Sequence, residues 1–418
     1  MSEMTLLEEL QWRGLLKDHT FEDLSWLNKP HSFYLGSDGS ADSLTIGNLA
    51  IYMMARVLAK HGWKAVLLVG GATSLIGDPG GKDEERPLKT KEEIEHNIAG
   101  IAGQVERMFD GLPFEMVNNY DWFKDIGYLD FLRDVGKHFS MTELMQREFI
   151  TARMNEGGAG ISYAEFSYNL IQGYDFYWLF KHKGVEAQIG ASDQWGNMLS
   201  GAALIRKLDG QEAHAFTMPL VVNKTTGKKF GKSEAGAVWL DPKRTSPTQF
   251  YQFWMNASDD EVEDFLKIYT ALSKPEVDEL MREFNVNRAG RAAQKRLAYE
   301  VTALMHGKER AEEEQMAYEA DLRKVDVRDL SDKQVERLKQ VLPYTTVALT
   351  DSLVEIMVSL SFASSKSEAL RLIASGGVYI NREKAMLTDD GYADIVRFRD
   401  GLNVLQVGKS RFALVEQR

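Results

Sequence analysis

Short apolar segments alternate with longer helical segments from about residue 30, and this order constrains the fold more than any other feature. The run "HSFYLG" is followed by "SLTIGNLAIYMMARVLAKHG", whose periodicity predicts a helix with Ser43 as its N-cap, and then by "KAVLLVGG". The two strand segments are apolar throughout, which is typical of a parallel sheet covered on both faces. Such a sheet binds ligands beyond the carboxyl ends of its strands. The sequence therefore predicts an α/β fold with a binding site at that edge.

Composition excludes several classes of site. The chain of 418 residues has no cysteine, so disulfides, thiolate nucleophiles and cysteine-ligated metals are excluded, and its eight histidines form no HExxH motif. We expect no structural metal, no membrane span and a cytoplasmic protein. The net charge of −12 argues against DNA or another nucleic acid as a partner unless the charge is unevenly distributed.

Changes in pattern divide the chain into four parts. The alternating α/β pattern covers residues 1–247, and helical periodicity dominates residues 248–322. A charge-rich linker at 323–348 leads to a compact segment at 349–418. We place the boundaries near residues 247, 322 and 349.

Three segments carry residues suited to binding a charged ligand. "VGGATSLIGDPGGKDEER" combines glycines with Asp78, Lys82 and Arg86, and an ordinary glycine-rich surface loop is its alternative reading. "FSYNLIQGYD" places Tyr168, Gln172 and Asp175 at i, i+4 and i+7, on one helical face that contacts either solvent or a polar ligand. "NKTTGKKFGKSEAG" is a lysine-rich loop that could close over a polyphosphate, or simply lie exposed.

Taken together, the motifs resemble one family over essentially the full length. "YLGSDGSADSL", "GGATSLIGDPGGK", "NNYDW", "FSYNLIQGYDF", "QIGASDQWGN" and "KFGKS" follow the order and spacing of the bacterial type of tyrosyl-tRNA synthetase, a class I aminoacyl-tRNA synthetase. The resemblance implies a Rossmann-like catalytic domain, an α-helical anticodon-binding domain and a small α+β RNA-binding domain.

The resemblance also implies the reaction and its partners. L-tyrosine and ATP, accompanied by Mg²⁺, would form tyrosyl-adenylate, and the tyrosyl group would pass to the 3′ end of tRNA(Tyr). A homodimer through the segment near "FLRDVGKHFS" is implied as well.

Residue roles follow from matching positions in the motifs. The resemblance implies three sets of residues. The tyrosine-binding set is Tyr34, Asp78, Tyr168, Gln172, Asp175 and Gln188; the ATP-binding set is Gly36, Asp38, Gly47, Asp193, Gln194 and Lys232; the catalytic set is Ser40, Thr45, Asn48, Lys82, Arg86, Lys229 and Lys232. In the helical part, Arg288, Arg291 and Lys295 are expected to form one basic face for tRNA phosphates, and an ordinary solvated helix face is the alternative.

The largest departure from the family lies at the start of the first predicted helix. Class I enzymes carry a HIGH motif there, and this chain reads Thr45-Ile46-Gly47-Asn48. Gly39 also replaces the usual proline, Ser40 the usual threonine and Ala191 a common glycine. In one reading Thr45 and Asn48 donate neutral hydrogen bonds to ATP, which are weaker than charged ones. In the other, the chain is a catalytically weakened paralogue that acts as an RNA-binding protein.

Overall fold

The computed structural model divides into two compact units, Met1–His306 and Gly307–Arg418. It describes residues 4–78, 89–145, 150–151, 154, 160–222, 230–233, 236–319, 326–348, 352–387, 401–408 and 411–417. Within this described part, no helix is both long and apolar enough to cross a membrane.

A five-stranded sheet in the order β3-β2-β1-β4-β5 forms the centre of the first unit. Its strands are β1 (Ser32–Asp38), β2 (Lys64–Gly70), β3 (Phe114–Asn118), β4 (Ala187–Ala191) and β5 (His214–Met218). Every neighbouring pair is parallel, which confirms the predicted sheet. The strand order changes direction between β1 and β4, and a crevice at the carboxyl ends of such a pair is where open α/β sheets bind ligands.

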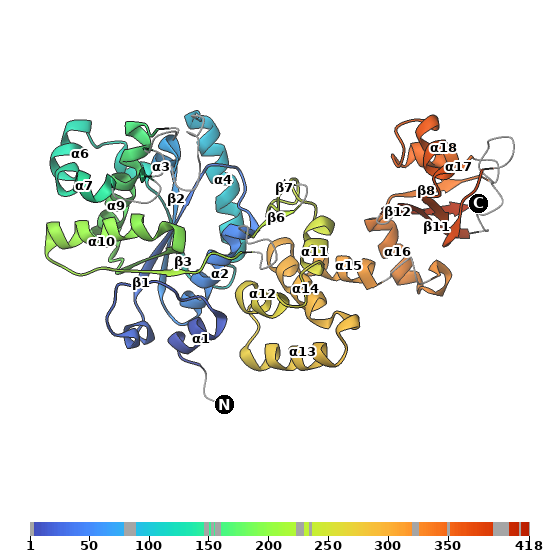
Figure 1. The fold of residues 1–418 in the computed structure, drawn as a ribbon, viewed down its shortest axis with the longest axis horizontal. Coiled ribbons are helices and arrows are strands. Elements are labelled where there is room, and N and C mark those ends of the chain that lie inside the picture. The colour runs from blue at the N-terminus through green and yellow to red at the C-terminus, as the bar shows by residue number, and fades with distance from the viewer. Residues whose placement is uncertain are drawn as a thin grey trace. The chain divides into compact units, whose positions relative to one another are not determined.

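Helices cover both faces of this sheet, as the apolar strands require. Figure 1 shows α2 (Ile46–Lys60) and α4 (Lys91–Met108) on one side and α9 (Tyr163–Lys183) and α10 (Trp195–Asp209) on the other. Shorter elements complete this part: α1 (Leu6–Arg13), η1 (Leu24–Asn28), α3 (Gly71–Ile76), α5 (Tyr120–Phe123), α6 (Tyr128–Asp134), η2 (Gly136–His138), α7 (Met141–Met145) and η3 (Ser192–Gln194).

The start of α2 differs from the prediction, because Thr45 and not Ser43 is its N-cap. The Ser43 hydroxyl instead donates to the Leu44 carbonyl at 2.8 Å, and it accepts hydrogen bonds from Gln104 Nε2 at 2.9 Å and from Asp241 N at 3.1 Å. Ser43 therefore joins the approach to α2 with α4 and with a segment from far along the chain.

The rest of the first unit is helical and rich in aromatic residues. A two-stranded ribbon, β6 (Lys232–Ser233) and β7 (Gly236–Ala237), precedes α11 (Pro247–Met255), α12 (Val262–Tyr269), α13 (Lys274–Val286), η4 (Arg288–Gly290) and α14 (Ala292–His306). The Phe230 ring lies 4.5 Å from that of Phe265 and 5.9 Å from that of Trp254, between ring centroids. The chain just before β6 is thereby packed onto α11 and α12.

The prediction of one basic helical face through Arg288, Arg291 and Lys295 is wrong. Arg291 has a left-handed backbone with φ of 54° and lies between η4 and α14, so the three residues do not share a helix. Its guanidinium donates to the Met255 carbonyl and, at 3.3 Å, to the Ala257 carbonyl. Arg291 thus caps the end of α11 within the fold.

The second unit packs helices against a mixed sheet. Its elements are α15 (Lys308–Glu319), η5 (Val327–Asp329), α16 (Asp332–Val341), β8 (Tyr344–Val347), α17 (Leu353–Ser359), α18 (Lys366–Ala374), β9 (Val378–Ile380), β10 (Glu383–Lys384), β11 (Gly401–Val407) and β12 (Arg411–Gln417). The sheet order is β10-β9-β11-β12-β8, and of the pairs described within this sheet only β12 with β8 is parallel. Met357, Ile373 and Leu405 belong to its core, which confirms the predicted α+β fold.

Candidate active site

Buried polar side chains lie between the sheet and α9. Tyr34 on β1 and Gln188 on β4 are register partners, and the Tyr34 ring packs 5.4 Å from that of Phe176 on α9. Among the described residues, the Tyr34 hydroxyl and the Oε1 atoms of Gln188 and Gln172 are buried and have no hydrogen-bond partner. Each such atom costs about 1 to 3 kcal/mol if it stays unpaired. A bound ligand with matching polar groups would supply the missing partners.

Asp175 on α9 is the charged group of this region. It is 2% exposed and accepts hydrogen bonds from Trp122 Nε1 at 2.9 Å and from Asn119 Nδ2 at 3.0 Å. Burial raises the pKa of Asp175 to about 8, although these two hydrogen bonds lower it, and the charge of Asp38 raises it further. A ligand hydroxyl that donates to Asp175 would therefore stabilise its ionised form.

Asn119 and Trp122 have no assigned role in the sequence analysis, although both lie in the "NNYDW" motif. Asn119 Oδ1 also accepts from Ala72 N at 2.7 Å, and the Trp122 ring stacks on Trp178 with centroids 4.2 Å apart. Asn119 directly follows β3 and Trp122 lies three residues later, at the carboxyl edge of the sheet. That position is the sequence signal that could have identified them.

A second group of polar residues lies beyond the carboxyl ends of the strands. The Tyr168 hydroxyl donates to Asp38 Oδ2 at 2.9 Å, and Gln194 Nε2 donates to Asp78 Oδ2 at 2.9 Å. Burial raises the pKa of Tyr168 well above its usual value, with further increases from the charges of Asp38 and Asp78. Two carboxylates close to one buried tyrosine make this region favourable for a cation.

The first turn of α2 lies at the same edge. Asn48 Oδ1 accepts hydrogen bonds from Thr45 N at 3.0 Å and Thr45 Oγ1 at 2.8 Å. Ile46 N donates to the Val238 carbonyl at 3.1 Å, and Thr45 forms an antiparallel bridge with Trp239. The segment that follows the lysine-rich loop therefore holds the backbone at the start of α2.

Close backbone packing adds to this arrangement. A Cβ at Gly231 would lie 3.2 Å from Gly47 N, and the φ of Gly231, +109°, already disfavours any side chain. The chain just before β6 thus comes directly against the turn that carries Asn48.

Gly39 has a local explanation in the structure. Its N–H donates to Ser74 Oγ at 2.6 Å, and its carbonyl accepts from Asn97 Nδ2 at 2.8 Å. Proline has no N–H and could not make the first bond. The loss of the usual proline is thus matched by a contact to α3.

The structure thus brings many of the predicted site residues to one edge of the sheet. One set lies between the sheet and α9: Tyr34, Gln172, Asp175 and Gln188. A second set lies beside it: Asp38, Asp78, Tyr168 and Gln194. Gly36, Ser40 and Asp193 are exposed at strand ends, and Gly47 is half-buried on α2. Lys82, Arg86 and Lys229 lie outside the described residues, and for Lys232 the structure describes the backbone only. Among the residues that are described, no three His, Asp or Glu side chains are placed to hold a metal ion.

Known proteins match both units. The family of tRNA synthetases class I (W and Y) matches residues 27–322, and the tyrosine–tRNA ligase SYY-like C-terminal domain matches residues 334–415. A tyrosine–tRNA ligase 1 of Streptococcus thermophilus is 42% identical over 420 residues, which cover 98% of this chain and 99% of the relative. A tyrosine–tRNA ligase of Staphylococcus haemolyticus is 40% identical over 421 residues, covering 99% of each chain.

A solved structure of the same family is also similar to this chain. The C-terminally truncated mitochondrial tyrosyl-tRNA synthetase of Aspergillus nidulans superposes with a TM-score of 0.69 at 30% identity, covering 76% of this chain and 94% of that one. The chain therefore belongs to the tyrosine–tRNA ligases, within the class I tRNA synthetases.

Proposed function

We propose that this ligase holds L-tyrosine between the sheet and α9, joins it to ATP, and transfers the tyrosyl group to the 3′ end of tRNA(Tyr). The observation that supports this proposal is the set of buried polar atoms on Tyr34, Gln172 and Gln188, next to Asp175, that have no partner in the described part of the chain. L-tyrosine carries one phenolic hydroxyl and one ammonium group, which can fill these vacant bonds.

The phenolic hydroxyl of the substrate forms hydrogen bonds with Tyr34 and Asp175. It donates its proton to the Asp175 carboxylate and accepts a hydrogen bond from the Tyr34 hydroxyl. Phenylalanine would leave the Tyr34 hydroxyl buried without a partner and would give Asp175 no ligand donor, and that loss is the source of discrimination.

The ammonium group of the substrate binds to Asp78, Tyr168 and Gln172. The Tyr168 proton is directed to Asp38 at 2.9 Å, so the Tyr168 oxygen keeps lone pairs that can accept from the cation. Gln172 Oε1 is a further acceptor, and Gln188 lines the same region.

ATP occupies the carboxyl edge beside the tyrosine. A carboxylate oxygen of tyrosine attacks the α-phosphorus, the bond to the pyrophosphate oxygen breaks, and pyrophosphate leaves with its electron pair. Gly36, Asp38, Gly47, Asp193 and Gln194 contact the nucleotide, while Ser40, Lys82, Arg86, Lys229 and Lys232 stabilise the phosphate charge. Mg²⁺ accompanies the phosphates, which are its usual partners.

The remaining parts receive the tRNA. We assign residues 248–322 to the anticodon side and residues 349–418 to RNA binding, with 323–348 as the linker. The protein works in the cytoplasm, where its three substrates occur together.

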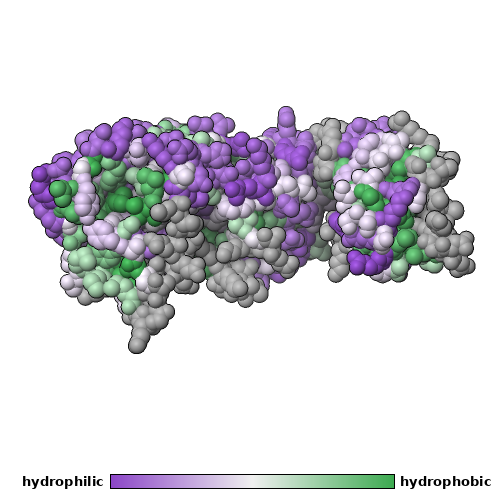
Figure 2. Space-filling view, turned by 90° about the horizontal axis from the view of Figure 1, so that it is seen from above, coloured by the Kyte–Doolittle hydropathy of each residue, from purple (hydrophilic) through white to green (hydrophobic). Residues whose placement is uncertain are grey.

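We further propose that the enzyme is a homodimer through the α6 and α7 region. Exposed apolar side chains cluster there, with Tyr128 63%, Leu129 77%, Met141 56% and Tyr163 60% exposed. Figure 2 shows hydrophobic surface over the end of the first unit where Figure 1 places α6, α7 and α9.

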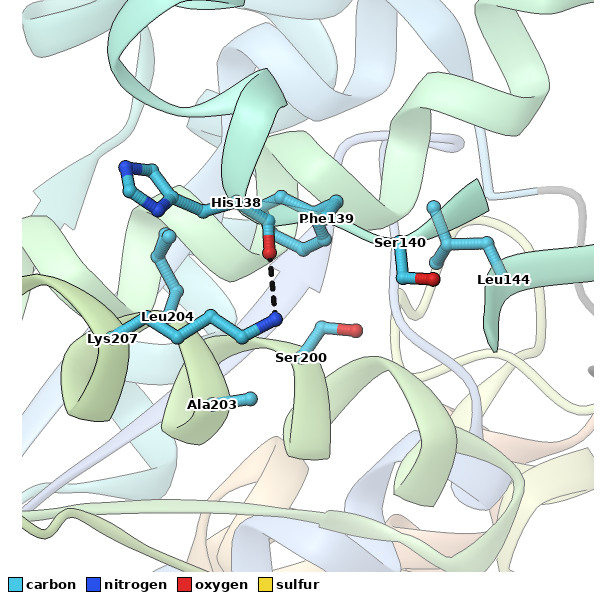
Figure 3. A pocket seen from close by; sticks show the side chains of 8 residues that line it. All are labelled: His138, Phe139, Ser140, Leu144, Ser200, Ala203, Leu204 and Lys207. Atoms are coloured by element: carbon cyan, nitrogen blue, oxygen red, sulfur yellow. Dashed lines mark hydrogen bonds between the residues drawn. The ribbon is translucent and has the colours of Figure 1, made fainter. Parts of the chain in front are cut away.

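A pocket beside these residues offers a concave complement. It is lined by His138, Phe139, Ser140, Leu144, Ser200, Ala203, Leu204 and Lys207. Figure 3 shows Lys207 closing one side of it through a hydrogen bond to the His138 carbonyl, 2.8 Å long. A second copy of this chain can pack its exposed apolar side chains across this face, although the pocket, of about 40 Å³, has room only for a small group.

Sedimentation of variants tests the dimer. Leu129→Asp should convert a dimer into a monomer, whereas Val286→Asp, at an apolar residue 89% exposed on α13, should leave the dimer intact. A wild-type monomer at micromolar concentration would refute the dimer.

Tyrosine-dependent exchange of pyrophosphate into ATP tests the function. Exchange that needs both tyrosine and Mg²⁺, and charging of tRNA(Tyr), would support it. Intact tRNA binding without any exchange would instead favour the weakened RNA-binding paralogue, in which Thr45 and Asn48 cannot replace the histidines.

A further inference from the structure

The two hydrogen bonds in the first turn of α2 fix the orientation of the Asn48 amide. Thr45 N and Thr45 Oγ1 both direct a hydrogen bond to the same atom, at 3.0 and 2.8 Å. A backbone N–H can only donate, so the atom that faces it has to be the carbonyl oxygen of the amide. The NH₂ group of Asn48 therefore faces away from Thr45.

The same bonds remove Thr45 as a free donor. Its hydroxyl proton is used on Asn48, whereas the Asn48 side chain is exposed at the third residue of α2. The N-terminus of a helix carries a partial positive charge and favours anions. Asn48 thus presents two N–H donors where the phosphates of a nucleotide would be stabilised.

We propose that Asn48 alone of this pair contacts bound ATP, through its NH₂ group, and that Thr45 is a positioning residue that holds the amide in this orientation. The inference rests on the proposed function, because it places ATP at the start of α2. It replaces the expectation that both residues donate to ATP.

The surrounding backbone makes the two roles separable. Ile46 N bonds to the Val238 carbonyl at 3.1 Å, Leu49 N bonds to the Thr45 carbonyl at 3.0 Å, and Thr45 bridges to Trp239. None of these bonds uses the side chain of Thr45 or Asn48. Shortening Asn48 also removes the bond that Thr45 N makes to its side chain, and these backbone bonds remain to hold the turn.

A double-mutant cycle tests the inference with Thr45→Val, Asn48→Ala and the double variant. The measurements are kcat/KM for ATP in pyrophosphate exchange and the equilibrium affinity for a non-hydrolysable ATP analogue. Each single change should lower both quantities by about 2- to 13-fold, the range expected for one neutral hydrogen bond. In the Asn48→Ala background, Thr45→Val should cost less than twofold more, since its effect passes through Asn48.

Two conservative variants sharpen the result. Thr45→Ser keeps the hydroxyl and should recover most of the loss. Asn48→Asp keeps an oxygen toward Thr45 but removes the NH₂ group, so it should weaken ATP binding at least as much as Asn48→Ala without lowering the melting temperature.

If the double variant loses ATP affinity by the product of the two single losses, Thr45 contacts ATP directly. If Asn48→Asp keeps the wild-type ATP affinity, the NH₂ group does not contact ATP. Either result overturns the inference. A wild-type protein without exchange would contradict the proposed function, while the affinity cycle would still decide the roles of Thr45 and Asn48.

Discussion

Replacing Tyr34 with phenylalanine should change stability and substrate binding in opposite directions. The Tyr34 side chain is 1% exposed, and its hydroxyl has no partner among the described residues. Burial, with the nearby charge of Asp175, raises its pKa well above the usual value, so the group stays neutral at any working pH. The variant removes only this hydroxyl and leaves the ring that packs on Phe176.

The expected changes in stability and in KM for tyrosine both follow from loss of the Tyr34 hydroxyl. An unpaired buried hydroxyl costs about 1 to 3 kcal/mol, so Tyr34→Phe should raise the free energy of unfolding of the ligand-free enzyme by up to that amount. With tyrosine bound, the same change loses a neutral hydrogen bond of about 0.5 to 1.5 kcal/mol, which raises KM for tyrosine about 2- to 13-fold. Selectivity against phenylalanine should fall in parallel.

Denaturant unfolding of the ligand-free enzyme and pyrophosphate exchange with varied tyrosine measure the two effects. Tyr269→Phe is the matched control, because the Tyr269 hydroxyl is also buried without a partner among the described residues but belongs to α12. It should stabilise the protein and leave KM for tyrosine unchanged. A destabilised Tyr34→Phe enzyme, or one with unchanged KM for tyrosine, would refute the reasoning.

Three further predictions concern Asp175 and the N-terminal helix. Burial raises the pKa of Asp175 from 3.8 to about 8, so folding takes up a proton between these values. The free energy of unfolding of the ligand-free enzyme should therefore fall as pH rises from about 4 to 8, and Asp175→Asn should remove this fall in denaturant titrations. Trp122→Phe removes a 2.9 Å hydrogen bond that lowers this pKa, so KM for tyrosine should rise and its pH profile should shift upward, whereas Trp178→Phe, at the stacking partner, should not shift it. The Arg13 guanidinium donates to the carbonyls of Lys267, Thr270 and Leu272 at 2.7, 3.0 and 2.8 Å, so Arg13→Lys should cost about 1 to 3 kcal/mol of stability without changing exchange at 25 °C.

The hydrophobic pattern of the sequence was sufficient to predict the strands of the first sheet and helix α9. Apolar runs such as "KAVLLVGG" are typical of strands buried on both faces, and β2 indeed has all but its first residue buried. The spacing of Tyr168, Gln172 and Asp175 likewise placed them on one helix, and α9 contains all three.

Contacts between distant segments could not be predicted in this way. Ser43 is the better N-cap by residue type, yet Thr45 caps α2 because Asp241 N and Gln104 occupy the Ser43 hydroxyl. Arg291 continues a helical pattern in sequence, yet the Met255 and Ala257 carbonyls attract its guanidinium and α14 begins only after it. From the sequence, Trp122 is expected to be a core residue, and only the structure shows that its Nε1 donates a hydrogen bond to Asp175.

The bonds that hold the start of α2 also have a consequence for synthesis of the chain. Asp241 N and Ser43 Oγ are 198 residues apart in sequence, and Ile46 and Val238 are separated almost as widely. A ribosome must therefore make 241 of the 418 residues before the turn that carries Asn48 can be held in place. A nascent chain that stops before Val238 could form β1, α2 and β2, but it would lack the backbone bonds that fix this turn. An enzyme that supplies translation with tyrosyl-tRNA would thus complete its proposed ATP site only after more than half of the chain has been translated.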